Sequence, residues 1–178
     1  MNRRMKRFVA ILALLAAGGC GYSQSGGRQA QESGYQWRSL YREDVRTVAV
    51  PIFVNRDFVR GVEFDLTKAI VNQLEATTPY KVVPRERADT ILEGEIVRVS
   101  VQTISEHPNA AIPQEQLYRV VCSFVWKDLR SGRILVERRN FEQTTPFYPT
   151  LGENRWVGNQ QGVERLALGI VQELQADW

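Results

Sequence analysis

The sequence predicts an α+β domain, an α/β sandwich in which two helices pack on one face of a mixed, mostly antiparallel sheet of four to five strands. β-Branched runs and two amphipathic helical patterns follow one another in the order β-α-β-β-β-β-α between residues 37 and 178. Each helical pattern carries a single apolar stripe, so each helix has only one face to bury. The arrangement that buries both stripes most simply places both helices on the same face of the sheet.

The first strand and the first helix come from residues 47–74. Residues 47–54 form an apolar run rich in β-branched side chains without a polar interruption, which favours a strand covered on both faces. In residues 62–74, apolar side chains recur at the spacing of one helix face, at Val62, Leu66, Ala69, Ile70 and Leu74. A strand followed by a helix that packs back on the sheet is the first half of a β-α-β unit.

The next two strands are predicted at residues 80–83 and 88–104. The short strand follows Pro79, which ends the helix, and is expected to be parallel to the first strand because a helix connects them. In the longer strand the apolar side chains change from even-numbered to odd-numbered positions after Ile96. Such a one-residue change of phase is typical of a β-bulge, which we place near Ile96 and Val97.

The rest of the sheet is predicted to be antiparallel. Residues 105–114 contain two prolines and are predicted to form a surface loop, and residues 117–127 alternate as the next strand. Residues 128–133 form a hairpin turn in which Ser-Gly allows the tight bend, and residues 134–141 return as the last strand.

The second helix closes the domain. A loop that contains Pro146 and Pro149 precedes it, and the helix is expected from about Asn154 to Leu174. Its predicted buried stripe consists of Trp156, Val163, Leu166, Ala167, Ile170 and Leu174. The pattern shows no repeat, so residues 37–178 are predicted to form a single domain.

Residues 1–19 have the pattern of a signal peptide. A basic start precedes ten apolar residues, which is too short for a membrane-spanning helix of about 20 residues. Small residues then precede Cys20, which resembles the bacterial lipobox and makes Cys20 the predicted lipid-attachment site; an ordinary secretory signal is the alternative. Residues 20–36 are rich in glycine and serine and are predicted to be a flexible tether. In enterobacterial lipoproteins, aspartate directly after the lipidated cysteine marks retention in the inner membrane. Glycine stands at this position, Gly21, so we expect the protein in the outer membrane.

Charge and cysteine content narrow the function. Four of the 23 basic residues lie in the signal peptide, which leaves 19 basic against 20 acidic side chains in the mature chain. The basic pI of the whole chain is therefore no argument for a nucleic-acid partner, because the mature chain is not basic. Cys122 has no other cysteine to pair with once Cys20 carries lipid, and it shares the parity of Val120 and Phe124, so we predict a buried thiol.

No catalytic signature is found in the sequence. His107 is the only histidine, in a loop that contains Pro108, and the motifs of metalloproteases, α/β-hydrolases and P-loop enzymes do not occur. Glu93 and Glu95 lie on the same face of a strand and could form an acid–base pair, but a solvated sheet face explains them better. We predict no enzyme, no cofactor and no metal site.

Basic side chains gather around the predicted hairpin turn. Lys127, Arg130 and Arg133 lie in or beside it, and Arg138 and Arg139 follow on the next strand. Arginine and lysine there could bind phosphates, since the guanidinium group offers a planar fork for two hydrogen bonds. They could equally keep a turn and an edge strand soluble and unpaired.

Several short stretches together resemble the LptE family of lipopolysaccharide-assembly lipoproteins of Gram-negative bacteria. They are Cys20-Gly21-Tyr22, residues 48–53 with Asn55, the helix at 63–74, residues 88–96, residues 131–133 and residues 138–141. The resemblance implies an LptE-like domain on the periplasmic side of the outer membrane, or inside the lumen of the LptD β-barrel that it plugs and helps to assemble. It implies LptD as partner and a role in lipopolysaccharide transport, with lipopolysaccharide itself as a further candidate ligand.

The candidate lipopolysaccharide contacts are Lys127, Arg130 and Arg133, since an exposed basic turn complements anionic phosphates. The strand at residues 48–55 with its helix also resembles lipoproteins that activate cell-wall synthases and curli-secretion lipoproteins. A lipoprotein activator of a cell-wall synthase, or another periplasmic lipoprotein adaptor, is therefore the alternative function.

Overall fold

The computed structural model describes residues 40–109 and 112–175. The expected signal peptide, the tether with Cys20, and Trp37 lie outside the described residues. The elements run in the order β1 (Thr47–Ala49), β2 (Val54–Asn55), α2 (Val62–Thr77), β3 (Lys81–Val82), η1 (Arg85–Arg87), β4 (Thr90–Glu106), β5 (Pro113–Asp128), β6 (Ile134–Phe147), η2 (Pro149–Leu151) and α3 (Arg155–Gln172).

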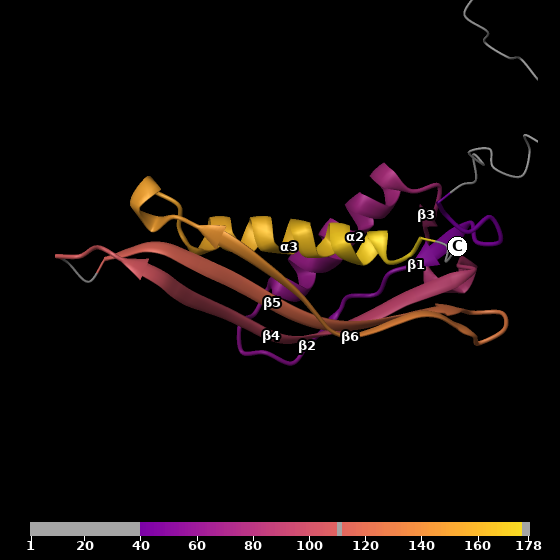
Figure 1. Ribbon diagram of the computed structural model, residues 1–178. Coiled ribbons are helices and arrows are strands. Elements are labelled where there is room, and N and C mark those ends of the chain that lie inside the picture. The colour runs from indigo at the N-terminus through magenta and orange to yellow at the C-terminus, as the bar shows by residue number, and fades with distance from the viewer. Residues whose placement is uncertain (1–39, 110–111, 176–178) are drawn as a thin grey trace, which may run out of the picture. The chain divides into compact units, whose positions relative to one another are not determined.

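The strands form one mixed sheet with the order β3-β1-β4-β5-β6, and β2 also pairs with β4. The pairs β1–β3, β1–β4 and β2–β4 are parallel, whereas the long strands β4, β5 and β6 are antiparallel. Both helices cover the same face of this sheet (Figure 1). The predicted α+β class is confirmed, including the parallel strand after the first helix. The sheet has six strands instead of four to five.

The extra strand arises because the predicted strand at residues 47–54 is divided in two. Pro51 has no N–H to donate, and the chain leaves the sheet between β1 and β2. Ile52 and Val54 are 57% and 50% exposed, so the expectation that both faces of this strand are covered is wrong beyond Ala49. Phe53 is buried, Val50 packs partly against the core, and the Phe53 N–H donates to the Thr67 hydroxyl at 3.1 Å.

The long strands contain the predicted bulge and turn but extend further than the sequence indicated. The register of β4 and β5 shifts between Ile96 and Arg98, which confirms the bulge. The predicted loop at residues 105–114 is wrong at both ends, because β4 runs to Glu106 and β5 begins at Pro113. The expected loop at Pro146 is likewise wrong: Pro146 lies in β6, where proline is tolerated because β6 is an edge strand.

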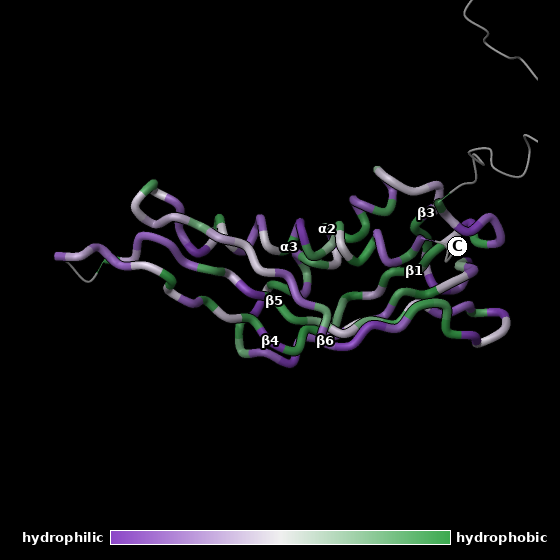
Figure 2. The backbone as a smooth tube through the Cα atoms, in the orientation of Figure 1, coloured by the Kyte–Doolittle hydropathy of each residue, from purple (hydrophilic) through white to green (hydrophobic). Residues whose placement is uncertain are grey.

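The core lies between the helices and the sheet, where the hydrophobic segments of the chain converge (Figure 2). The predicted stripe of α2 is buried except for Ala69, which is partly buried, and α3 begins as predicted after Asn154, whose side chain accepts from two amides of the first turn. Trp156 is the exception, since it is 66% exposed in that first turn. Cys122 is buried as predicted, and desolvation raises the pKa of its thiol to about 12.

Three close contacts between glycines and aromatic rings set the distance between layers. A Cβ atom added to Gly158 would lie 2.7 Å from the Phe147 ring, and one added to Gly162 would lie 2.7 Å from the Tyr118 ring. On the sheet, a Cβ atom at Gly94 would lie 2.3 Å from the Phe53 ring. Real Cβ atoms do not approach ring carbons so closely, so each glycine makes room for a buried aromatic side chain.

Gly94→Ala is therefore expected to destabilise the domain by about 1–3 kcal/mol through overpacking against Phe53. The free energy of unfolding, measured by urea denaturation, tests this. Phe53→Leu in the Gly94→Ala background should recover part of the loss, because the shorter side chain removes the ring atoms that clash. Additive effects of the two substitutions would contradict the contact.

Candidate functional site

The three predicted cations lie together where β5 ends, the hairpin turns and β6 begins, and we call Lys127, Arg130 and Arg133 the hairpin cations. Lys127 Nζ lies 3.1 Å from Glu93 Oε2, and Glu93 also pairs with Arg85 at 3.2 Å. Arg130 forms an ion pair with Asp89. Within the described ranges, no carboxylate is within ion-pair distance of the Arg133 guanidinium. The hairpin cations thus differ in how strongly acids hold them.

The turn that carries two of these cations is held by its own hydrogen bonds. The Asp128 carboxylate accepts from the amides of Arg130 at 2.7 Å and Ser131 at 2.9 Å, and these bonds lower the pKa of Asp128. Gly132 has a φ of 72°, a left-handed conformation that glycine adopts at low cost. The Asp128 carboxylate thus holds the backbone of the turn, and the charge of Arg133 beside it stabilises its ionised form.

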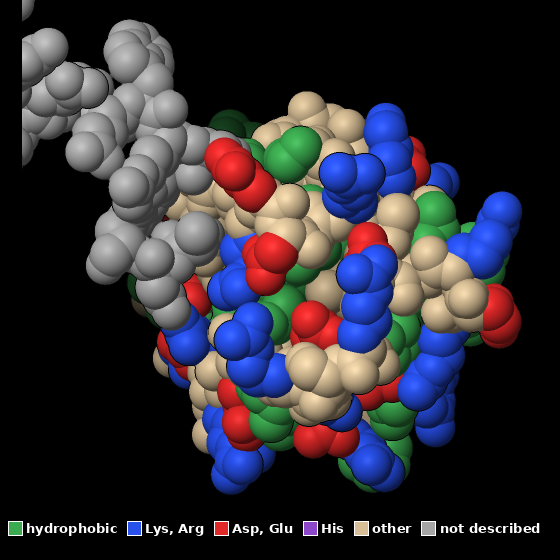
Figure 3. Space-filling view, turned by 90° about the vertical axis from the view of Figure 1, so that its right-hand side faces the viewer, with side chains coloured by type: hydrophobic (Ala, Val, Ile, Leu, Met, Phe, Trp, Pro, Cys, Tyr) green, Lys and Arg blue, Asp and Glu red, His purple; other side chains and the backbone are tan. Residues whose placement is uncertain are grey.

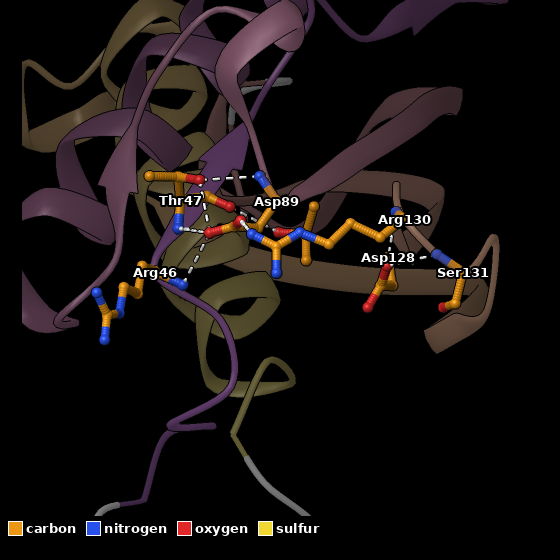
Figure 4. Close-up of polar contacts among 7 residues, drawn as sticks. Arg46, Thr47, Asp89, Asp128, Arg130 and Ser131 are labelled. Carbon is orange, nitrogen blue, oxygen red and sulfur yellow. Dashed lines mark hydrogen bonds and ion pairs between the residues drawn. The ribbon is translucent and has the colours of Figure 1, made fainter.

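Asp89 links the turn to the start of the sheet (Figure 4). Its carboxylate accepts from the Thr47 hydroxyl at 2.8 Å, from the Thr47 amide at 3.1 Å and from the Arg46 amide at 3.3 Å, besides pairing with Arg130. Its own amide donates to the Thr47 hydroxyl at 2.8 Å, and its carbonyl accepts from the Leu129 amide at 2.9 Å. One side chain thereby joins β1, β4 and the hairpin.

These bonds stabilise the ionised form of Asp89. The Thr47 hydroxyl, the Arg46 amide and the charge of Arg130 lower the pKa of its carboxyl group, against a desolvation effect that raises it. The Asp89 side chain is 18% exposed, whereas that of Arg130 is 77% exposed. The acid is therefore an internal anchor and the arginine is the outward-facing group.

The surface at this end of the sheet is rich in exposed basic side chains (Figure 3). Lysine and arginine side chains project around it, with acidic groups set among them. Arg46, Lys81, Arg87, Arg130 and Arg133 are exposed here. Of the adjoining arginines, Arg138 pairs with Glu173 of the α3 cap at 2.6 Å, so it is tied to the helix layer instead of joining the hairpin cations. A phosphate group could bind Arg133 directly and Arg130 by replacing Asp89.

The other sequence candidates occupy ordinary positions. Glu93 pairs with Lys127 and Arg85, and Glu95 pairs with Arg56 at 3.1 Å, so both acids are neutralised on the uncovered sheet face. His107 Nδ1 accepts from the Asn109 amide at 3.2 Å. Within residues 40–109 and 112–175, no group of His, Cys, Asp and Glu side chains is placed to hold a metal ion.

A groove of about 700 Å³ lies on the uncovered sheet face, where the chain leaves the sheet between β1 and β2. Ile52, Val54 and Val125 form its apolar part, and Lys127 connects it to the hairpin end. The sequence did not predict this groove, because it depends on the division of the first strand at Pro51.

The chain is thus an α+β domain with two helices on one face of a mixed sheet and a basic hairpin at one end of that sheet. Residues 45–177 match the family model of LptE, described as lipopolysaccharide-assembly, and the chain belongs to this family. It is thus a Gram-negative envelope lipoprotein of lipopolysaccharide assembly, as the sequence resemblance predicted. A comparison with curated proteins gives no match. In the described part of the chain, the helices are too short or too polar to cross a membrane.

Solved structures share the fold at low sequence identity. The PelC dodecamer from Paraburkholderia phytofirmans is 17% identical with a TM-score of 0.53, over 76% of this chain and 93% of that chain. A hypothetical protein from Chlamydia trachomatis is 10% identical with a TM-score of 0.53, over 71% and 94%. Lipoprotein B from Nitrosomonas europaea is 12% identical with a TM-score of 0.51, over 78% and 88%. At these identities the likeness is one of fold.

Asp89→Asn is expected to lower the free energy of unfolding by about 1–2 kcal/mol at pH 7, since a charged acceptor of several hydrogen bonds becomes neutral. The folded-state pKa of Asp89 lies below its ordinary value of 3.8, so its contribution is complete above that value and is lost as the pH falls through the folded-state pKa. Urea denaturation of the wild type and of the Asp89→Asn variant between pH 7 and pH 2 tests this. The difference between their free energies of unfolding should become smaller only below about pH 4. A constant difference would contradict the role of the charge.

Proposed function

We propose that this protein is an outer-membrane lipoprotein, anchored through Cys20, that plugs an LptD-type β-barrel, helps it to assemble and supports delivery of lipopolysaccharide. The family match over residues 45–177 is the observation that carries this proposal, because the LptE family works with LptD. The surface is compatible with it: the lumen of a membrane barrel is polar, and the charged side chains of the uncovered sheet face are largely joined in ion pairs.

We further propose that the hairpin cations contact the phosphates of lipopolysaccharide. Arg133 is exposed and forms no ion pair within the described residues, and Arg130 is highly exposed although Asp89 holds it from one side. The turn itself is fixed by Asp128 and Gly132, so a ligand would not have to order it on binding. Lys127 completes the set at the end of β5, with Glu93 as its present partner.

Purification of the tagged lipoprotein from detergent-solubilised outer membrane tests the role as a plug. A large β-barrel recovered in stoichiometric amount supports the proposal. Recovery of a cell-wall synthase in its place would favour the alternative role of a synthase activator. A lipoprotein that is recovered alone would contradict both.

Arg130→Ala combined with Arg133→Ala is expected to weaken binding of purified lipopolysaccharide at least about tenfold, because two charge-assisted phosphate contacts are removed. Arg60→Ala combined with Arg165→Ala is the matched control, since it removes the same charge from exposed positions outside the hairpin. Titration followed by intrinsic tryptophan fluorescence measures both. Equal weakening by the two variants would show a general charge effect and contradict a site at the hairpin.

A further inference from the structure

The two long edges of the sheet differ in how they are protected. On the side of β4 away from β5, β1 pairs at Thr90 and Ile91 and β2 pairs at Glu95 and Ile96. Beyond Ile96, no described strand pairs with β4 on that side. The second half of β4 is therefore an edge, although its first half lies inside the sheet.

This edge has a defined beginning and end. The Val99 amide points away from β5, because it donates to Asp57 Oδ2 at 3.1 Å. The register with β5 is uninterrupted from Arg98 to Thr103, so alternation directs the amides of Val101 and Thr103 to the same outer side. A register shift after Thr103 ends the regular stretch. Asp57 thus covers the edge at Val99, whereas within residues 40–109 and 112–175 the outward main-chain groups of Val101 and Thr103 have no strand partner.

The sequence of this edge lacks the usual protection against pairing. Residues 99–105 read Val-Ser-Val-Gln-Thr-Ile-Ser, with no charge, no proline and no glycine. The opposite edge, β6, carries Arg138 and Arg139, a positive φ of 52° at Asn140, and Pro146. Charged side chains, irregular backbone and proline are the features that keep an edge strand from adding a neighbour. One long edge of the sheet is blocked and the other is open.

We propose that the edge of β4 at Val101 and Thr103 binds an extended segment of the barrel partner that is uncharged opposite these two residues and adds a strand to the sheet; this rests on the proposed function. The main-chain groups of an exposed sheet edge can form hydrogen bonds with the main chain of any extended peptide, which then becomes an additional strand. Arg98 and Glu106 flank the stretch, so the segment that fits has an acidic residue beside Arg98 and a basic residue beside Glu106. These charges set its direction.

The length of the edge argues for a segment of a partner that is also held elsewhere, and against a second copy of this chain. Only two residues present outward main-chain groups between the Asp57 contact and the register shift. A stable dimer buries about 1,200 Å² or more in total, which a contact of this length does not reach. A short added strand contributes usefully when the two proteins already meet over another surface.

Hydrogen–deuterium exchange with single-amide resolution tests the proposal on the full lipoprotein, alone and in the complex purified from the outer membrane. The Val101 and Thr103 amides are expected to exchange at least tenfold more slowly in the complex than in the free protein. Unchanged exchange at both amides in a complex that contains the barrel would overturn this inference and leave the proposed function standing. If the two amides are already protected in the free protein, and this protection increases with protein concentration, a second copy of the chain occupies the edge. That result would also overturn the inference.

A comparison of the Thr103→Pro and Thr103→Val variants distinguishes an added strand from a partner that only covers the edge. Both substitutions remove the hydrogen bond from Gln116 of β5 to the Thr103 hydroxyl, and proline also removes the outward amide, which valine keeps. Thr103→Pro should restore fast exchange at Val101 in the complex, and Thr103→Val should not. If folded Thr103→Pro still protects Val101, the inference is wrong. If Thr103→Pro does not fold, the wild-type exchange measurement decides, and if no barrel is recovered at all, the proposed function and this inference fail together.

Discussion

The contact network of Asp89 is the interaction on which the rest of this structure depends most. A single carboxylate accepts from two amides and a hydroxyl at the start of β1 and also holds Arg130 of the hairpin. Three chain segments that are 40 or more residues apart in sequence meet there. Because β1 is only three residues long, its own ladder hydrogen bonds are few, and the side chain of Asp89 supplies part of what a longer strand would provide.

The spacing of the helix and sheet layers follows a second constraint, which is the approach of aromatic rings to glycines. Gly158 and Gly162 allow α3 to lie directly on Phe147 and Tyr118, and Gly94 gives Phe53 the same room from the sheet side. Tyr118 then reaches Asn159 with its hydroxyl at 2.5 Å, and Asn159 donates to Asp65 of α2 at 3.3 Å. Close packing on the sheet therefore also aligns the two helices with each other.

Most of the fold could be predicted from the sequence because its determinants are local. The stripe of α2, the bulge at Ile96 and the turn at residues 128–133 are periodic patterns or turn signals. The length of β6 could not be predicted, since Pro146 signals a loop unless the strand is known to lie at an edge. The exposure of Trp156 also depends on tertiary placement. At the candidate site, the cations were visible in the sequence, whereas the Asp89 anchor required contacts 42 residues apart.

The ion pairs on the uncovered sheet face also determine which kind of partner surface this face can lie against. Lys127 with Glu93, Arg56 with Glu95 and Arg139 with Glu137 are all partly exposed, and each such pair contributes only about 0–1 kcal/mol to stability. Their main effect is on the surface: they keep this face polar with little net charge. A polar, balanced face can lie against the polar wall of a barrel without leaving an isolated charge desolvated. Under the proposed function, Arg130 and Arg133 of the hairpin lie beyond this balanced face and are the groups that would contact an anionic ligand.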